Sequence, residues 1–195
     1  MTGALGTEPP GGGPPRREPA ARAVVLSLGS NLGDRHANLQ AGIDGLLAGP
    51  GLRATAVSSV YQTSPVGGPP QPDYLNAVLL AVSALPARAI LERCQAVERA
   101  AGRVRNLAWG PRTLDIDIVA CDEEISDEPD LTLPHPRAHE RAFVLVPWQE
   151  ADPAARLPGH GPVAGLLAGL GAGGVHRLGG PAGRLAITTT AGEGA

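Results

Sequence analysis

The sequence predicts an α+β domain with a ferredoxin-like core, in which an antiparallel sheet carries both helices on one face. Three observations predict this class. Apolar runs typical of strands are interspersed with two segments of helical periodicity, Pro- and Gly-rich loops separate the segments, and their order reads β-α-β-β-α-β. The two crossovers of such a fold leave the other face of the sheet open to loops and a ligand.

The first strand is expected over residues 23–28, an apolar run that ends at a Gly-Ser-Asn turn. A helix should follow, because apolar side chains recur at helical spacing over residues 39–47. Asp34 can cap the start of this helix, and Gly49 followed by Pro suits its end. The N-terminal third of the chain therefore supplies one strand and one helix.

Two further strands are expected over residues 52–62 and 74–83, joined by a loop rich in Pro and Gly. The next segment is helical in its spacing. Pro86 suits the first turn of this second helix, and Gly102 suits its C-terminal end. A fourth strand after this helix completes the predicted order.

The fourth strand carries the most informative pattern of the chain, Arg-Thr-Leu-Asp-Ile-Asp-Ile at residues 112–118. In an extended chain Asp115 and Asp117 project from one face, with roots about 6 to 7 Å apart, while the apolar residues project from the other. Such a pair suits one or two Mg²⁺ ions, which also bind water and phosphate, and Arg112 adds a phosphate donor. An edge strand with a solvated polar face is the alternative for an isolated pattern of this kind.

The two ends of the chain differ in composition from its middle. Residues 1–22, mainly Gly, Pro and Ala, are expected to form a disordered arm. The folded domain is expected over residues 23–170, with a last helix near residues 163–170. A flexible tail is expected over residues 171–195. Because the start lacks the apolar stretch of a signal peptide and no membrane-spanning segment is expected, we expect a cytoplasmic protein.

The composition excludes several classes of site. The chain has no lysine, so its 16 basic residues are all arginines, and neither a Walker-A loop nor a Schiff-base lysine is present. The net charge of −3 gives no reason to expect a nucleic-acid surface. Cys94 and Cys121 form no C-x-x-C pair, so no disulfide framework or thiolate zinc site is indicated. Bound phosphate must be held by Arg, metal ions, His or backbone amides.

Seven short motifs lie along the chain. They are SLGSNLGD (27–34), YQTSPVG (61–67), QPDYLNA (71–77), GRVR (102–105), WGPRTLDID (109–117), LPHP (133–136) and RAFVL (141–145). In order and approximate spacing these motifs resemble the family of 6-hydroxymethyl-7,8-dihydropterin pyrophosphokinases, over roughly residues 23–170. The resemblance implies transfer of pyrophosphate from ATP to the hydroxymethyl oxygen of a reduced pterin, a step of folate synthesis that releases AMP. It also implies small-molecule substrates and two Mg²⁺ ions, and we expect a monomer.

The resemblance further implies which residues meet the nucleotide and the metals. Asp115 and Asp117 match the two metal ligands, and Arg103 and Arg112 match arginines on the triphosphate, so these four are the catalytic candidates. A helix end next to Arg103 is a structural alternative for its charge. For Gln95 and Glu98 a solvated helix face is an equal alternative. The complete nucleotide side is Gln95, Glu98, Arg103, Trp109, Arg112, Ile118, His135 and Arg141.

On the pterin side, Tyr74 and Phe143 match two aromatic residues that sandwich the ring. Asn76 matches an amide whose donor and acceptor edges fit those of the ring, and Thr63 and Val66 match loop positions that meet the pterin through backbone groups. Since the chain has only two Tyr and one Phe, an aromatic residue beside a Gly/Pro loop is a good candidate for stacking. Phe143 also lies in an apolar run, so a core position is its alternative.

A zinc site is a weaker candidate. His135 and His139 have the i, i+4 spacing of a zinc-binding helix with Glu140 adjacent, but Pro134 and Pro136 oppose a regular helix there. The sequence also departs from the family at Ala108, where relatives commonly carry a basic residue, so one phosphate contact is expected to be absent.

Two other functional classes stay open. A nucleotidyltransferase also combines a Gly-Ser turn with a D-h-D strand, but there the two elements lie close in the sequence, whereas here strands and helices separate Gly29-Ser30 from Asp115. AMP rather than pyrophosphate as product would distinguish the two reactions. A pterin- or nucleotide-binding protein without catalysis is the other class, and the intact set of Arg112, Asp115, Asp117 and His135 opposes it.

Overall fold

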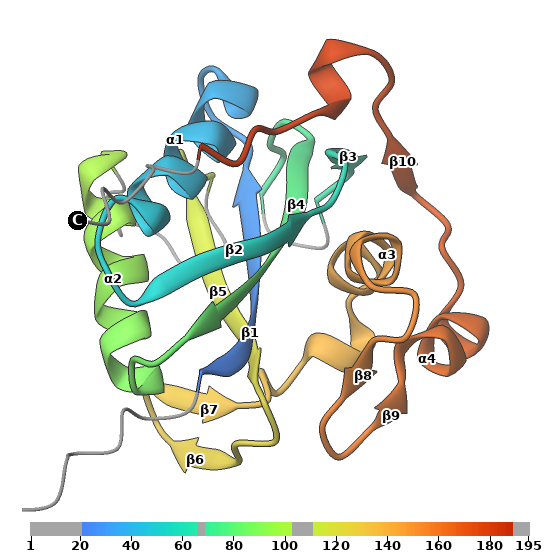
Figure 1. The fold of residues 1–195 in the computed structure, drawn as a ribbon. Coiled ribbons are helices and arrows are strands. Elements are labelled where there is room, and N and C mark those ends of the chain that lie inside the picture. The colour runs from blue at the N-terminus through green and yellow to red at the C-terminus, as the bar shows by residue number, and fades with distance from the viewer. Residues whose placement is uncertain (1–20, 66–68, 103–110, 189–195) are drawn as a thin grey trace, which may run out of the picture.

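The computed structural model describes residues 21–65, 69–102 and 111–188, and these form three layers with a sheet in the middle (Figure 1). The helices α1 and α2 lie on one side of the sheet and α3 and α4 on the other. The elements are β1 (Arg22–Ser30), α1 (Arg35–Leu47), β2 (Leu52–Val57), β3 (Tyr61–Thr63), β4 (Tyr74–Ser83), α2 (Ala87–Ala100), β5 (Asp115–Cys121), β6 (Ser126–Glu128), β7 (Leu131–Leu133), η1 (Ala138–Glu140), α3 (Ala142–Ala151), β8 (Arg156–Leu157), β9 (Gly161–Pro162), α4 (Val163–Leu170), β10 (Val175–Arg177) and η2 (Pro181–Gly183).

The main sheet has the order β10-β3-β4-β1-β5, and β2 also pairs with β4. Every pairing in it is antiparallel, with β1 between β4 and β5. With β2 and β3 together standing for the strand predicted over residues 52–62, the elements from β1 to β5 follow the order β-α-β-β-α-β, so the predicted α+β class with a ferredoxin-like core is confirmed.

The larger core lies between the sheet and the first helix pair. Leu26 and Leu28 of β1 meet Leu39 and Ile43 of α1 there, all four without exposed surface. Burial of each such side chain contributes about 1.5 to 3 kcal/mol. The Asp34 carboxylate accepts a hydrogen bond from the amide of Ala37 at 3.0 Å, so the predicted cap of α1 is confirmed.

The opposite face of the sheet is not open along its length, and this part of the prediction was wrong. α3 packs there, with Val144 and Trp148 in one buried cluster with Val25, Val78 and Val119 of the strands. A helix covers these side chains because they form a second apolar surface in the middle of the sheet. The part of this face toward the Ser30 end of β1 carries polar residues instead.

The predicted strand over residues 52–62 is divided into β2 and β3. At the break, Ser58 replaces regular pairing with two bonds to Val78: its amide donates to the Val78 carbonyl, and its hydroxyl accepts from the Val78 amide, both at 2.9 Å. The hydroxyl therefore takes the place of a backbone acceptor, and the regular strand pairing is interrupted between β2 and β3.

The ends of the chain also differ from the prediction. Arg22, assigned to the arm, opens β1 and forms an ion pair with Glu124. The helix expected near residues 163–170 is α4, but the predicted tail is ordered on the domain as far as residue 188: β10 pairs with β3, and Leu178 and Leu185 pack against the larger core. Residues 1–20 and 189–195 lie outside the described part. In the described residues, no helix has the length and apolarity needed to span a membrane.

Candidate active site

The predicted site residues gather where β5, β1, β4 and β3 lie side by side, beyond the part of the sheet that α3 covers. The register places Asp115, Gly29, Asn76 and Tyr61 in one row across these four strands. Gly29 matters in this row because a methyl group on it would lie 3.3 Å from the Asn76 side-chain oxygen. The missing side chain leaves room between the carboxylate of β5 and the amide of β4.

The two aspartates of β5 lie as the sequence predicts. Asp115 and Asp117 are partly buried on the polar face, while Ile116 and Ile118 are buried against the helices. The Ile118 side chain therefore points away from the aspartates, so only its backbone remains for the predicted contact with a nucleotide. Pairing of β5 with β1 positions both carboxylates.

Two guanidinium groups and one imidazole surround the carboxylates. The Arg112 guanidinium donates to Asp115 at 2.5 Å, and the Arg141 guanidinium donates to Asp117 at 3.1 Å. The ring nitrogen Nε2 of His135 lies 3.7 Å from the same Asp117 oxygen. Three predicted phosphate ligands thus converge on the aspartate pair.

The electrostatics of the pair favour an added positive charge. Burial, and then repulsion from Asp115, raise the pKa of Asp117, although His135 and Arg141 oppose the rise. Burial lowers the pKa of His135, and Asp117 counteracts this. Two carboxylates two residues apart are hard oxygen donors of the kind that Mg²⁺ prefers, so the donor set fits such an ion.

The two helix residues of the nucleotide side differ from each other. Glu98 is 3% exposed, and its carboxylate accepts a hydrogen bond from the Ile116 amide at 2.8 Å. The alternative of a solvated helix face is therefore wrong for Glu98, which fastens α2 to β5 between the two aspartates. Gln95 is half-buried on the same helix.

The pterin-side residues lie on β3, β4 and α3. The Asn76 amide donates to the Thr63 hydroxyl at 2.8 Å, and both residues are buried. Tyr74 is half-buried and donates from its hydroxyl to Gln71 at 3.2 Å. Phe143 is half-buried at the start of α3, with the Arg141 guanidinium 5.6 Å from its ring centre. Phe143 thus packs at the edge of the smaller core and is still partly exposed. This position agrees both with a core role and with stacking on the pterin.

Asn31 is a site residue that sequence reasoning missed. It is 1% exposed, and its amide nitrogen donates to the Gln71 side chain at 2.9 Å and to the Pro72 carbonyl at 3.3 Å. Its side-chain oxygen accepts from the Arg112 amide at 2.7 Å. The available signal was the motif SLGSNLGD, in which this Asn and Gly29 were assigned to a turn.

The two histidines of the weaker zinc hypothesis have different surroundings. His135 lies beside Asp117, and its amide donates to the Val119 carbonyl at 2.8 Å. His139 stacks on His160 with ring centres 4.2 Å apart. Within the described ranges, no group of three or more His, Cys, Asp or Glu side chains is placed to hold a metal ion. The predicted site residues Val66, Arg103 and Trp109 lie outside those ranges.

The stretch of sequence that builds this site is matched by a family model. The model of 7,8-dihydro-6-hydroxymethylpterin-pyrophosphokinase (HPPK) matches residues 25–153. The chain belongs to this family. HPPK relatives named 2-amino-4-hydroxy-6-hydroxymethyldihydropteridine pyrophosphokinase include that of Mycobacterium tuberculosis, 49% identical over 160 residues that cover 75% of this chain and 83% of the relative. That of Methylorubrum extorquens is 43% identical over 156 residues, covering 80% and 98%.

Solved structures agree with the HPPK assignment at the level of the fold. The crystal structure of Plasmodium falciparum HPPK-DHPS with SDX-DHP has a TM-score of 0.59 at 12% identity, and the match covers 77% of this chain and 44% of that one. The structure of its A437G variant with pteroate gives 0.60 at 12% identity, covering 78% and 43%. This chain thus spans less than half of those longer chains.

Proposed function

We propose that this HPPK-family protein transfers pyrophosphate from ATP to 6-hydroxymethyl-7,8-dihydropterin, giving the pterin diphosphate and AMP. The convergence of Arg112, Arg141 and His135 on the carboxylates of Asp115 and Asp117 is the observation that carries the proposal. It places two guanidinium cations and an imidazole where a triphosphate would bind, beside two ligands for the metal that accompanies ATP. The reaction forms a bond from the hydroxymethyl oxygen, which gives up its proton, to the β-phosphorus, and breaks the bond from that phosphorus to the oxygen that leaves with AMP.

Asp115 and Asp117 would hold the two proposed Mg²⁺ ions. Mg²⁺ bound there would neutralise charge that develops on the phosphate oxygens during transfer. The protein itself contributes the fixed spacing of the two carboxylates, since β5 is paired to β1 and tied to α2 through Glu98. Preorganised ligands of this kind need no rearrangement during the reaction.

The arginines and His135 would orient the triphosphate. Arg112 and Arg141 each engage a carboxylate through a guanidinium, and each has further donors for phosphate oxygens. Catalysis of this type is mostly alignment and charge stabilisation. Gln95, Arg103, Trp109 and the Ile118 backbone are proposed to complete the nucleotide side.

The pterin would lie against Tyr74 and Phe143, with Asn76 on its polar edge. Asn76 has an amide oxygen to accept from the ring, and Thr63 fixes the orientation of the amide by accepting from its nitrogen. Thr63 and Val66 would add backbone contacts. The space over Gly29 then separates this edge from Asp115, so that the acceptor oxygen can approach the phosphates.

The products of the purified protein test the proposal. With ATP, Mg²⁺ and 6-hydroxymethyl-7,8-dihydropterin, we expect AMP and pterin diphosphate in equal amounts, measured by liquid chromatography. Pyrophosphate release would indicate a nucleotidyltransferase, and binding of both ligands without products would indicate a non-catalytic protein. Either result would refute the proposed reaction. The expected cytoplasmic location and monomeric state stay predictions.

A further inference from the structure

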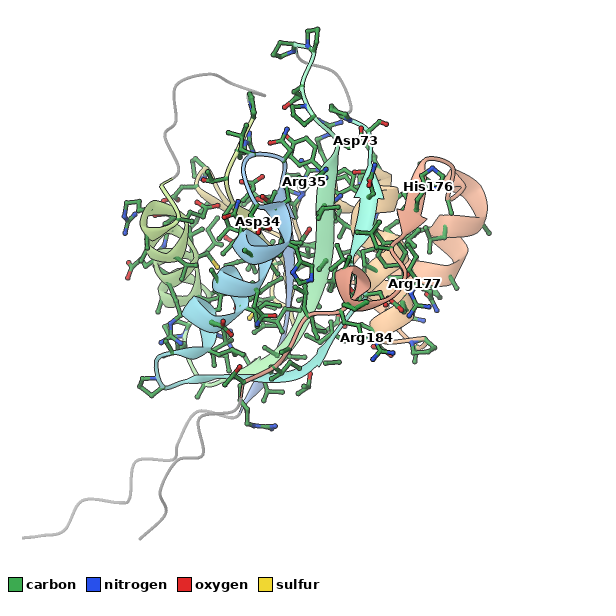
Figure 2. All side chains as sticks on the ribbon, turned by 90° about the horizontal axis from the view of Figure 1, so that it is seen from above. Asp34, Arg35, Asp73, His176, Arg177 and Arg184 are labelled. Carbon is green, nitrogen blue, oxygen red and sulfur yellow. The ribbon has the colours of Figure 1, made fainter. Side chains whose placement is uncertain are left out.

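Residues 175–186, here called the C-terminal strap, run along the outer edge of β3 and then return across α1 (Figure 1). Figure 2 shows His176 and Arg177 on the first part of the strap and Arg184 on the part near α1. The family model ends at residue 153, so the strap lies outside the matched region. The strap covers a strand edge that carries one wall of the proposed pterin site.

The strap is joined to β3 by backbone pairing. Val175 lies opposite Thr63 and Arg177 opposite Tyr61 in the antiparallel register. Just before β3, the chain is held twice: Leu178 donates its amide to the Val60 carbonyl at 2.9 Å, and the Val60 amide donates to the Gly183 carbonyl at 3.1 Å. The strap therefore bonds both the backbone carbonyl and the backbone amide of Val60.

Side chains anchor the strap at two further points. The Arg177 guanidinium donates to the Ser59 hydroxyl at 2.9 Å and lies 3.0 Å from the Glu150 carboxylate of α3. On α1, the Gln40 side chain forms a pair of bonds with Ala186, donating to its carbonyl at 2.9 Å and accepting from its amide at 2.8 Å. The strap is thus tied to both helix layers.

We infer that the C-terminal strap positions the pterin end of the active site by fixing β3, an inference that rests on the proposed function. β3 is only three residues long, and its inner partner β4 would otherwise be its sole neighbour in the sheet. Thr63 accepts the hydrogen bond that orients Asn76, and Gln62 donates to the Asp73 carboxylate at 2.8 Å. Movement of this short strand would therefore displace the Asn76 amide and the loop that leads to Tyr74.

The strap should act selectively on the pterin. The described phosphate-side residues Arg112, Asp115, Asp117 and Arg141 bond to one another and lie on or near β5, at the other edge of the sheet. β4 and β1 separate this edge from β3. Loosening the strap should therefore raise the Michaelis constant (KM) for pterin, while the KM for ATP stays nearly constant.

Gly183 offers a clean way to loosen the strap. A methyl group on this residue would lie 2.1 Å from the Leu178 carbonyl oxygen, so Gly183→Ala must open the turn between the two backbone contacts of Val60. Gly179→Ala is the matched control, because nothing lies within 4 Å of the added methyl group. The two variants add the same atoms to the same turn.

The experiment combines exchange and kinetics. In Gly183→Ala without ligands, amide hydrogen exchange of Val60 and of β3 should accelerate about tenfold. The KM for 6-hydroxymethyl-7,8-dihydropterin should rise about tenfold, as expected for one weakened hydrogen bond, with the KM for ATP within about twofold of wild type. Gly179→Ala should match wild type in all three measurements.

A milder variant keeps the test decisive if Gly183→Ala does not fold. Gln40→Ala removes both bonds to Ala186 and should give the same selective change at a smaller size. Unaltered exchange in β3, or equal rises of the two KM values, would overturn the inference. Absence of AMP formation by the wild-type protein would instead refute the proposed reaction, and the exchange measurement would still report on the hold of the strap on β3.

Discussion

Asn31 and Arg112 hold each other through two hydrogen bonds. The backbone amide of Asn31 donates to the Arg112 carbonyl at 3.0 Å, and the backbone amide of Arg112 donates to the Asn31 side-chain oxygen at 2.7 Å. With its side-chain nitrogen Asn31 also holds Gln71 and Pro72, in the loop before Tyr74. One buried side chain therefore connects the phosphate side of the site to the pterin side.

Asn31→Ala should weaken both sides of the site. The change removes three hydrogen bonds from a buried position, so we expect the free energy of unfolding to fall by about 2 to 3 kcal/mol. The KM should rise for both substrates, in contrast to the strap variants. Urea unfolding and steady-state kinetics measure the two effects. Asn38→Ala is the control, because it removes bonds to Ser30 and Leu32 that do not connect the two sides of the site. Wild-type KM values for both substrates in Asn31→Ala would contradict the role given to Asn31.

Asp115→Asn and Asp117→Asn should each lower kcat by at least about 100-fold, because each removes a charge that holds a metal ion. The fold should persist, since both side chains are partly exposed rather than core. Circular dichroism checks the fold, and Mg²⁺-dependent AMP formation checks the activity. Asp127→Asn, an exposed carboxylate on β6, is the control. A folded double variant with wild-type turnover at saturating Mg²⁺ would eliminate the two-metal proposal.

Arg112→Lys should reduce kcat/KM for ATP by about 10- to 100-fold. Lysine keeps the charge but lacks the planar fork that can engage Asp115 and a phosphate oxygen together. Arg53→Lys on the exposed side of β2 should have no effect. Initial rates at varied ATP concentration measure the change, and equal rates for Arg112→Lys and wild type would show that charge alone suffices at this position.

Tyr61 should titrate abnormally. Burial, and then the negative charge of Glu150 together with its hydrogen bond, raise the pKa of Tyr61 to about 12. In Tyr74→Phe, which leaves this one tyrosine, about a tenth of the phenol should be ionised at pH 11, against about nine tenths for an ordinary tyrosine. Absorbance at alkaline pH measures the ionised fraction. Glu150→Gln should lower the pKa, whereas a pKa near 10 in the folded protein would contradict the contact.

The same shift has a consequence for stability. The folded protein keeps its Tyr61 proton to higher pH than the unfolded chain, whose tyrosines have an ordinary pKa of about 10. The contribution to stability is therefore complete below about pH 10 and is lost as the pH rises toward about 12. Urea unfolding should show a decline over this range that is reduced in Tyr61→Phe.

Local signals predicted the helices and the aspartate strand well. The Asp34 cap, the helical spacing and the alternation of Asp115, Ile116 and Asp117 depend only on neighbours in the sequence, and all three are confirmed. The break at Ser58 was missed because it depends on Val78, twenty residues away. An apolar pattern can show that a strand is broken only if its distant partner is known.

Long-range contacts also explain the other errors. The cover provided by α3 requires Val144 and Trp148 to meet strands more than sixty residues earlier, as well as β5. As a charged residue on a helix, Glu98 is expected from the sequence to be exposed. Its burial depends on the bond from the Ile116 amide, eighteen residues away. Residues 175–177 have the composition of a tail, and become a strand because β3 offers a free edge.

The bond from Glu98 to the Ile116 amide also bears on how faithfully the chain reaches its native pairing. A slip of β5 by one residue along β1 would turn Asp115 and Asp117 into the apolar layer and bring Ile116 and Ile118 out to the ligands. In that misaligned state the buried Glu98 carboxylate would lose its bond from the Ile116 amide, and a lost bond to a charged group costs about 1.5 to 3 kcal/mol. The buried Glu98 thereby discriminates against the inactive alignment while the protein folds.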